Sequence, residues 1–215
     1  CFSFHAQKNI TTLGEGGAIY VKNNLLSKKV IGLRHNGHRN YLKKRKYYWK
    51  PAMVNVQEDL IQHWPYNFCL SEVQCAIGRA LLNRVDEIND LRRQRSDLIR
   101  KDLETLGCFK FQNIPDNCTS AYHLLPSRFD LSSRGISRDK FIEYMYVQKG
   151  VKLIIQYNPL YRYDLFKSKG FGDACCPETD NFYDNMISFP FDLWMPDETV
   201  EKLIQLTKEA VKELS

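Results

Sequence analysis

The residues best suited to covalent chemistry lie near the start of the chain. Lys8 follows the hydroxyl residue Ser3 by five positions, and a glycine-rich bend comes next at Gly14, Gly16 and Gly17. A lysine amine held on such a turn can form a Schiff base with an aldehyde, and a serine hydroxyl can donate a hydrogen bond to a phosphate. Glycines allow positive φ angles and close approach of the backbone. Spacing alone leaves a second interpretation open, a polar hairpin with an exposed lysine.

The residue types in this segment resemble the cofactor-lysine motif of one enzyme family. Residues 3–17 read Ser-Phe-His-Ala-Gln-Lys-Asn-Ile-Thr-Thr-Leu-Gly-Glu-Gly-Gly. This text is similar to that of the DegT/StrS-type sugar aminotransferases, fold-type I enzymes that use pyridoxal 5'-phosphate (PLP). The resemblance implies that Lys8 carries the cofactor as a Schiff base and that Ser3 contacts the cofactor phosphate. Relatives with histidine at the lysine position perform dehydration, so the intact Lys8 favours transamination.

A second segment resembles the same family. Residues 66–78, Tyr-Asn-Phe-Cys-Leu-Ser-Glu-Val-Gln-Cys-Ala-Ile-Gly, are similar to the family's Asn-Tyr-Arg-Met-x-x-x-Gln-Ala-Ala motif. The resemblance implies that Asn67 reaches across a homodimer to the cofactor phosphate of the neighbouring subunit, for which an amide N–H is a suitable neutral donor. The chain departs from the motif at residues 68–70, where an arginine is missing. Without the resemblance, Asn67 would be interpreted as a turn residue after Pro65.

The hydrophobic periodicity that follows predicts one long helix over residues 71–106. Ser71 and Gln74 have the spacing of a capping box, and Gly107 is placed to end the helix. The predicted apolar face comprises Val73, Ile77, Leu81, Val85, Ile88, Leu91 and Leu98, and the predicted polar side includes Arg92, Arg93, Arg95 and Asp97. At ~1.5 Å per residue the helix would be roughly 50 Å long. We therefore expect it to bridge two domains or to pack against a second subunit.

Strands mixed with helices predict a mixed α/β protein. With the family resemblance, the fold class is an incomplete PLP-dependent transferase fold of fold type I. Its expected parts are a remnant of the PLP-binding large domain at residues 1–70, the inter-domain helix at residues 71–106 and a small C-terminal α+β domain at residues 107–215. We expect strands at residues 18–21, 109–111, 121–125, 128–129 and 151–156, helices over residues 25–33 and 137–149 and from residue 196, and an irregular loop before Trp64.

Two segments of the second half resemble family motifs, one of them near the sugar-binding site. Residues 120–124 read Ser-Ala-Tyr-His-Leu, and residues 156–161 read Gln-Tyr-Asn-Pro-Leu-Tyr where the family has His-Tyr-x-Pro-Leu-His. The resemblance implies substrate contacts for His123, Tyr157 and Tyr161, although both histidines of the second motif are replaced here. The alternative is that His123 is a hydrogen-bonded core residue and that the two tyrosines are packing aromatics.

Composition and charge limit the remaining possibilities. The 215 residues are 43% hydrophobic and 26% charged, which is ordinary for a globular protein, and no apolar run approaches the ~20 residues of a membrane helix. The 7 cysteines form no C-x-x-C pair, so we expect free thiols in a reducing cytoplasm and no metal site. Basic and aromatic residues alternate over residues 34–50, within a net charge of +6. This stretch could bind single-stranded nucleic acid, or form a solvated loop or a rim that attracts a phosphorylated small molecule.

The resemblance implies an enzyme similar to perosamine synthetase. Such an enzyme moves an amino group, usually from glutamate, to a keto sugar on a nucleoside diphosphate, in amino-sugar and surface polysaccharide biosynthesis. In the family, a carboxylate for the pyridine nitrogen and an aromatic for the ring precede the lysine motif, whereas seven residues precede Lys8 here. We therefore expect that the N-terminal half is missing or is a separate piece. The alternatives are a non-catalytic remnant that keeps a dimerisation surface, and a nucleic-acid-binding module.

Overall fold

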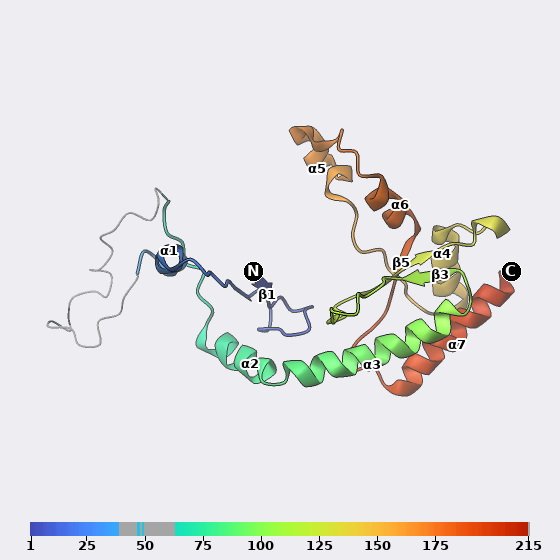
Figure 1. The fold of residues 1–215 in the computed structure, drawn as a ribbon, viewed down its shortest axis with the longest axis horizontal. Coiled ribbons are helices and arrows are strands. Elements are labelled where there is room, and N and C mark those ends of the chain that lie inside the picture. The colour runs from blue at the N-terminus through green and yellow to red at the C-terminus, as the bar shows by residue number, and fades with distance from the viewer. Residues whose placement is uncertain (39–46, 48, 50–62, 215) are drawn as a thin grey trace. The chain divides into compact units, whose positions relative to one another are not determined.

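The computed structural model describes residues 1–38, 47, 49 and 63–214 of the chain, which forms two compact units, Cys1–Val85 and Asp86–Ser215 (Figure 1). The α-helices of the described residues are α1 (Asn24–Arg34), α2 (Glu72–Leu82), α3 (Val85–Glu104), α4 (Arg138–Lys149), α5 (Asp164–Phe166), α6 (Pro177–Asn185) and α7 (Asp197–Glu213). The strands are β1 (Phe2–Ser3), β2 (Gly17–Ala18), β3 (Phe109–Phe111), β4 (Leu125–Phe129) and β5 (Met186–Phe189). Most of the basic stretch interpreted as a loop or a nucleic-acid surface lies outside the described residues.

The first unit contains a small hairpin and two helices. β1 and β2 pair antiparallel with Phe2 opposite Ala18. The helix predicted at residues 25–33 is confirmed as α1, whose N-cap Asn23 accepts a hydrogen bond from the backbone N–H of Leu26 at 3.0 Å. The strand predicted at residues 18–21 is shorter than expected, because only Gly17–Ala18 pairs with β1.

The single long helix predicted over residues 71–106 is wrong, since α2 and α3 are separate helices. The capping box is confirmed: Gln74 N donates to Ser71 Oγ at 3.3 Å and Ser71 N to Gln74 Oε1 at 3.1 Å. α2 ends in a turn where Arg84 N donates to Leu81 O at 3.0 Å. This three-residue bond tightens the last turn and interrupts the α-helical ladder.

The interruption changes which side of the second helix is buried. The buried residues of α3 are Ile88, Arg92, Ser96, Ile99 and Leu103. Leu91 and Leu98, which the continuous pattern placed on the apolar face, are 37% and 42% exposed. Arg92, assigned to the polar side, is only 7% exposed. The prediction failed because it carried the α2 stripe through a turn that resets the helical phase.

The second unit is built on a three-stranded antiparallel sheet in the order β3–β4–β5. Phe109 lies opposite Phe129, and Leu125 lies opposite Phe189. The strand predicted at residues 109–111 is confirmed. The strand predicted at residues 121–125 is wrong for residues 121–124, because β4 begins at Leu125 and continues through the strand predicted at residues 128–129. Residues 151–156, also predicted as a strand, contribute an isolated bridge to β5 instead.

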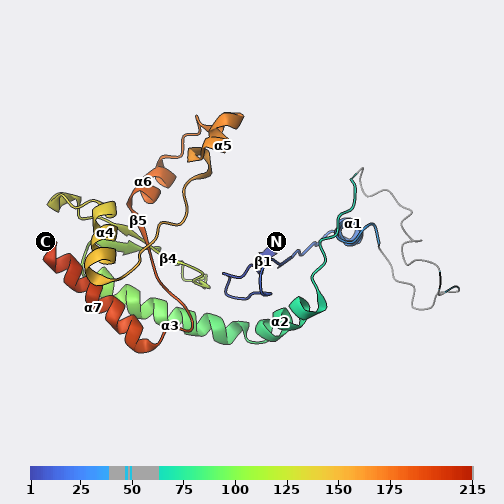
Figure 2. The ribbon, with the colours of Figure 1, turned by 180° about the vertical axis from the view of Figure 1, so that it is seen from behind.

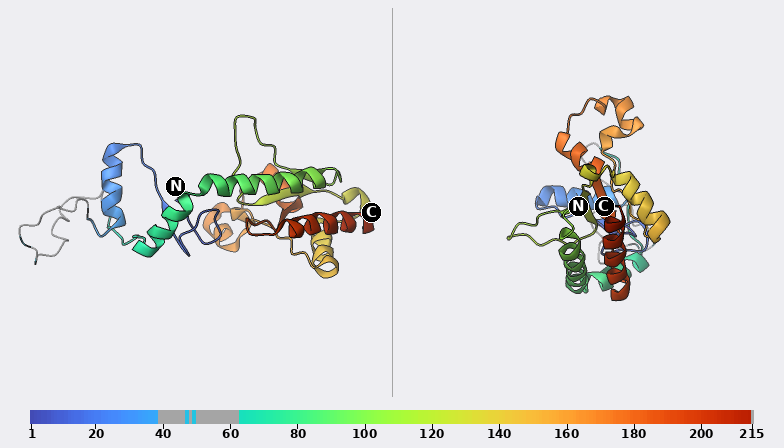
Figure 3. Two further views of the ribbon diagram at one scale, coloured as in Figure 1. Left: turned by 90° about the horizontal axis from the view of Figure 1, so that it is seen from below. Right: turned by 90° about the vertical axis from the view of Figure 1, so that its right-hand side faces the viewer.

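Helices α3, α4 and α7 share one hydrophobic core with this sheet. The core includes Ile99, Leu103, Phe109, Leu125, Phe129, Phe141, Met145, Ile187, Val200 and Ala210. α4 is confirmed between its predicted signals, the N-cap Ser137 and the left-handed Gly150. α3 and α7 run alongside each other, and Arg95 of α3 reaches Asp197 of α7 at 3.3 Å (Figures 1 and 3).

One excursion leaves the sheet and returns to it. After the bridge near residue 154, the chain passes through α5 and α6 and re-enters the sheet as β5 (Figures 1 and 2). Two of the three sequence-predicted substrate residues, Tyr157 and Tyr161, lie on the outgoing limb of this excursion. Among the described residues, none of the helices combines the length and the apolar character needed to span a membrane.

Candidate active site

The lysine-bearing turn is held by backbone hydrogen bonds across the hairpin. Phe4 N donates to Gly16 O at 2.8 Å, and Thr12 N donates to Phe4 O at 3.0 Å. Within the turn, Lys8 N donates to His5 O at 2.9 Å, and the lysine is half-buried. The backbone around Lys8 is therefore defined by local bonds, which is what a turn that presents one side chain requires.

Two different reasons explain the glycines that follow the lysine: Gly14 adopts a φ angle of 142°, whereas Gly16 and Gly17 are closely packed. Thr12 is 1% exposed, and a Cβ atom at Gly16 would collide with its Oγ1 atom. A Cβ atom at Gly17 would lie 2.7 Å from Phe2 O. Gly78 of α2 approaches Thr12 equally closely, since a Cβ there would be 2.9 Å from Thr12 Cγ2. These close approaches hold the two arms of the hairpin and α2 together.

The two sequence motifs of the first unit are joined by Gln74. Its Oε1 atom caps α2 at Ser71, while its Nε2 group donates to Glu15 O at 3.1 Å. The Gln74 side chain thus satisfies a backbone N–H group at the start of α2, and it also fixes α2 to the glycine-rich bend. The spacing of Ser71 and Gln74 predicted the cap. It could not predict the hydrogen bond from Gln74 to Glu15, because the two residues are far apart in the sequence.

Asn67 is exposed and is anchored through its backbone. It forms an antiparallel bridge with His35 just after α1, and its Oδ1 atom accepts from Cys69 N at 3.4 Å. Within the described part of the chain, the Asn67 amide nitrogen donates to no recorded acceptor, so its N–H groups are available to an anion. Ser3 lies exposed on β1, where its Oγ atom accepts from His5 N at 3.4 Å.

These groups fit the two ends of PLP in chemical type. Lys8 supplies a primary amine for the aldehyde, and Ser3 and Asn67 supply a hydroxyl and an amide donor for the phosphate. All three belong to the first unit, Cys1–Val85. The crowding between Gly16 and Thr12 gives the turn a defined backbone, which a lysine that must meet one particular carbon needs.

The first substrate candidate of the second unit, His123, is positioned through its backbone. The guanidinium of Arg92 donates to Tyr122 O at 2.7 Å and to His123 O at 2.9 Å. Burial lowers the pKa of Arg92, and the charge of Asp192 opposes this. Sequence reasoning missed Arg92; the available signal was its four-residue step from the buried Ile88.

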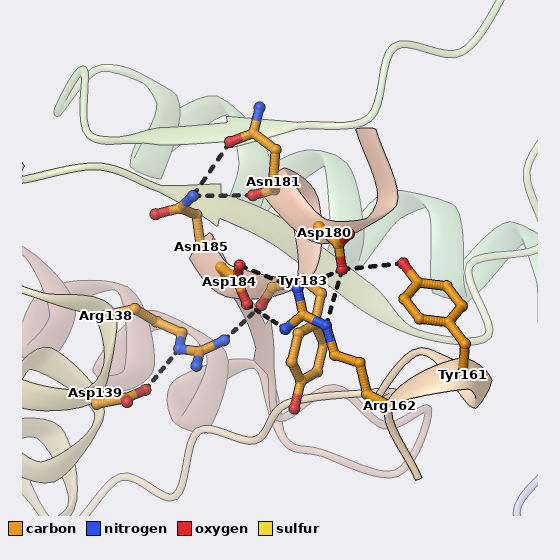
Figure 4. A network of polar contacts seen from close by, with 9 residues as sticks. All are labelled: Arg138, Asp139, Tyr161, Arg162, Asp180, Asn181, Tyr183, Asp184 and Asn185. Carbon is orange, nitrogen blue, oxygen red and sulfur yellow. Dashed lines mark hydrogen bonds and ion pairs between the residues drawn. The ribbon is translucent and has the colours of Figure 1, made fainter. Parts of the chain in front are cut away.

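Tyr161 is engaged in a network that fixes its loop to α6. Its hydroxyl donates to Asp180 Oδ1 at 3.0 Å, and Arg162 Nε donates to the same oxygen at 2.8 Å (Figure 4). Arg162 Nη1 also reaches Asp184 at 2.5 Å. Burial, together with the hydrogen bond to Asp180, raises the pKa of Tyr161 to about 12. These contacts favour the packing alternative for Tyr161, whose substrate role stays a prediction.

Tyr157 remains accessible on the same limb. It is 61% exposed, and its hydroxyl accepts from Gln156 Nε2 at 3.3 Å. The hydroxyl hydrogen is therefore left to meet a further acceptor. Of the two tyrosines in the loop, Tyr157 is the better placed to contact a solute.

Known proteins similar to this chain are sugar aminotransferases. The family model described as the DegT/DnrJ/EryC1/StrS aminotransferase family matches residues 1–208. A UDP-4-amino-4,6-dideoxy-N-acetyl-beta-L-altrosamine transaminase of Campylobacter jejuni is 31% identical over 189 residues, which are 88% of this chain and 46% of that protein.

Two solved structures share the fold. PseC of Helicobacter pylori, an aminotransferase involved in the biosynthesis of pseudoaminic acid, matches with a TM-score of 0.81 and 24% identity, over 99% of this chain and 53% of its own. The sugar aminotransferase CalS13 of Micromonospora echinospora matches with a TM-score of 0.75 and 20% identity, over 96% and 50%. The chain thus spans about half the length of the relatives it matches.

The comparisons confirm the fold class expected from the sequence, that of the PLP-dependent transferases of fold type I, here in part. The family match covers both the lysine motif and the Asn67 segment, and it indicates PLP as the cofactor. The resemblance based on two short motifs therefore extends over almost the whole chain, which belongs to the DegT/DnrJ/EryC1/StrS aminotransferase family.

Proposed function

We propose that the protein to which this chain belongs is a nucleotide-sugar aminotransferase. It would transfer an amino group from an amino-acid donor, with glutamate as the expected donor, to a keto sugar carried by a nucleoside diphosphate. Family membership supports the reaction type, and the relative from Campylobacter jejuni is named as a UDP-sugar transaminase. The observation that carries the proposal is Lys8, half-buried on a turn within the segment that resembles the family's cofactor-lysine motif.

Each residue of the first unit has a defined task in this proposal. PLP, when bound, supplies an electron sink for the carbon that loses its proton. Lys8 Nζ would hold the cofactor at its aldehyde carbon, and the free Lys8 amine would accept and return the proton as a general base and acid. The Ser3 hydroxyl and the Asn67 amide donate to the phosphate. As in the family, Asn67 would serve the neighbouring subunit of a homodimer.

The second unit would contact the sugar. Tyr157 offers an exposed hydroxyl, and Arg92 holds the backbone that carries His123. Tyr161 acts through the loop it fixes to α6. The carboxylate for the pyridine nitrogen and the aromatic for the ring are proposed to come from polypeptide outside this sequence, because the chain spans about half of its relatives.

Covalent capture on one lysine tests the proposal. The full chain is incubated with PLP, reduced with borohydride and mapped by peptide mass spectrometry. We expect a single added cofactor mass at Lys8, absent from Lys8→Ala and retained in the control Lys22→Ala, an exposed lysine of the same unit. Label spread over surface lysines, with none at Lys8, would contradict the proposal and favour a non-catalytic remnant.

A second measurement separates a complete from an incomplete site. If the missing groups come from another polypeptide, adding the corresponding part of a full-length relative should raise the rate of amino transfer from glutamate while the Lys8 label stays at the same position. Labelling that persists without any such gain would leave PLP capture intact and would argue against the shared-site part of the proposal.

A further inference from the structure

A pair of cations lies on the face of the second unit's sheet that is turned away from the core. Lys110 of β3 and Arg128 of β4 are directly opposite in the strand register. Their neighbours Phe109, Phe111 and Phe129 point the other way and are buried in the core. Like charges placed directly opposite each other destabilise a sheet, so this pair calls for a compensating group.

Acidic side chains supply little of that compensation. Among the residues that the structure describes, Lys110 Nζ has no recorded acceptor, and the Arg128 guanidinium donates to the neutral Asn181 Oδ1 at 3.2 Å. Asp130, which follows β4, accepts from Ser132 N at 3.0 Å and from Ser132 Oγ at 2.7 Å. These bonds, and to a lesser degree the charge of Arg128, lower the pKa of Asp130. Asp130 therefore compensates Arg128 in part, and a bound anion would remove the remaining repulsion between the two cations.

The two cations line a hollow with an aromatic wall. The hollow has a volume of ≈ 480 Å³ and is lined by Lys110, Phe111, Gln112, Pro126, Arg128 and Phe182. Phe182 comes from α6 and is 43% exposed. The neighbouring Asn181, which Figure 4 shows on α6, fixes that helix to β4 through its bond with Arg128. Small-molecule sites have volumes of roughly 300–1,000 Å³ and combine apolar walls with a few convergent polar groups.

We propose that this hollow binds an organic phosphate, with the phosphate between Lys110 and Arg128 and a flat or apolar group against Phe182. The planar fork of arginine and the compact charge of lysine are the two side chains best suited to phosphate oxygens. A bound phosphate would also remove the repulsion between the cross-strand cations. The inference concerns a second site and stands whether or not Lys8 carries PLP.

Calorimetry at constant ionic strength tests the site with three probes, inorganic pyrophosphate, uridine monophosphate and uridine. The full chain should bind both phosphates and not uridine. Lys110→Gln should weaken both phosphates by about tenfold or more, the loss expected for a charged hydrogen bond. Phe182→Ala should weaken the nucleotide by about fivefold or more while leaving pyrophosphate unchanged, because only the nucleotide has a ring to stack. If Phe182→Ala weakens both probes equally, or neither, the proposed contact between Phe182 and the organic group is wrong.

Two controls keep the outcome specific. Lys140→Gln removes an equally exposed lysine from α4 and should change nothing. Ser3→Ala removes the proposed cofactor-phosphate donor, so unchanged binding separates this hollow from the PLP site. The proposal is overturned if Lys110→Gln has no effect, if either control weakens binding as much, or if an acidic peptide binds and pyrophosphate does not. Because Lys110 is exposed, circular dichroism should show Lys110→Gln folded like the parent chain.

Discussion

The two units differ in where their apolar side chains lie. Among the residues that the structure describes, every buried hydrophobic side chain belongs to the second unit, beginning with Ile88. In the described part of the first unit, the buried side chains are the polar Thr12 and His38, while Tyr20, Leu25 and Trp64 are 76%, 74% and 84% exposed. Among its described residues, the unit that carries Lys8 thus has no buried hydrophobic side chain.

The difference shows two ways of holding a structure. The second unit gains its stability from apolar burial, the largest favourable contribution to folding. The first unit relies on backbone hydrogen bonds across its hairpin, on caps and on close approaches at glycines such as Gly16. Each of those is a small contribution. Mutations should therefore act on the units through different mechanisms.

The largest effect is expected in the aromatic core. Phe141 is 0% exposed, and its ring lies 4.5 Å from that of Phe129 and 5.8 Å from that of Phe109, centroid to centroid. Phe141→Ala should lower the free energy of unfolding by about 3–5 kcal/mol, measured by urea titration with far-UV circular dichroism. The control Tyr20→Ala in the first unit should change it by less than about 0.5 kcal/mol. Similar losses from both variants would show that the first unit has a core of its own.

Arg92 should come next, because it is buried and serves two carbonyl groups. Arg92→Ala should cost about 3 kcal/mol in the same titration, since Tyr122 O and His123 O lose a charged donor. Arg93→Ala is the matched control; its partner is Asp90 one turn earlier on the helix surface, and such pairs contribute roughly 0–1 kcal/mol. If the two variants have the same free energy of unfolding, the buried hydrogen bonds of Arg92 do not contribute to the stability of the fold.

A smaller, local effect is expected at the lysine turn. Gly16→Ala places a Cβ against Thr12 Oγ1, and the strain should cost about 1–3 kcal/mol within the hairpin. PLP labelling of Lys8 should fall several-fold, while unfolding of the second unit stays unchanged. Adding Thr12→Ala to Gly16→Ala removes the colliding atom and should restore part of the labelling. Full labelling of Gly16→Ala alone would rule out a positioning role for this contact.

The smallest effect is a pH dependence at α6. The hydrogen bond from Arg162 lowers the pKa of Asp184 below its ordinary 3.8. Because the folded pKa is below the unfolded one, the pair stabilises the fold above about pH 4 and loses this contribution as the pH falls through the folded pKa. Asp184→Asn should thus be less stable than the parent at about pH 6, and the difference should vanish in strong acid. The control Asp164→Asn, at a fully exposed carboxylate 3.6 Å from Lys167 Nζ, should change the stability at about pH 6 by less than about 0.5 kcal/mol. A difference between Asp184→Asn and the parent that persists in acid would refute the assignment.

Local signals allowed several elements to be predicted from the sequence. Ser71 with Gln74, Ser137 with Gly150, and the apolar spacing of α7 each specify structure within a few residues. The break between α2 and α3 could not be predicted, because residues 83–84 contain neither proline nor glycine. Because this turn was not predicted, the buried face of α3 was assigned to the wrong residues, and Arg92 was grouped with the surface arginines.

The candidate site also contains residues that local sequence signals identify and contacts that they do not. The motifs around Lys8 and Asn67 could be recognised from residue types and spacing, and the family match supports that recognition. The partner of Tyr161 could not be predicted from the sequence, because Asp180 lies nineteen positions away. The two residues come close only because the chain returns through α6. Residues 151–156 were predicted as a strand, but among the described residues they form one bridge, between Ile154 and Ser188 of β5. The reason is similar, because strand formation depends on the tertiary contacts that a segment makes as well as on its residue types.

By itself, the sequence determined the chemistry-bearing motif, the helix caps and the family, because these depend on residue types within one short segment. The tertiary structure alone decided that Gln74 reaches Glu15, that Arg92 supports His123, and that Lys110 lies beside Arg128 at the hollow. Such pairings require distant segments to meet. In the second unit burial of the shared core brings those segments together, and in the first unit backbone hydrogen bonds and close contacts at glycines do so.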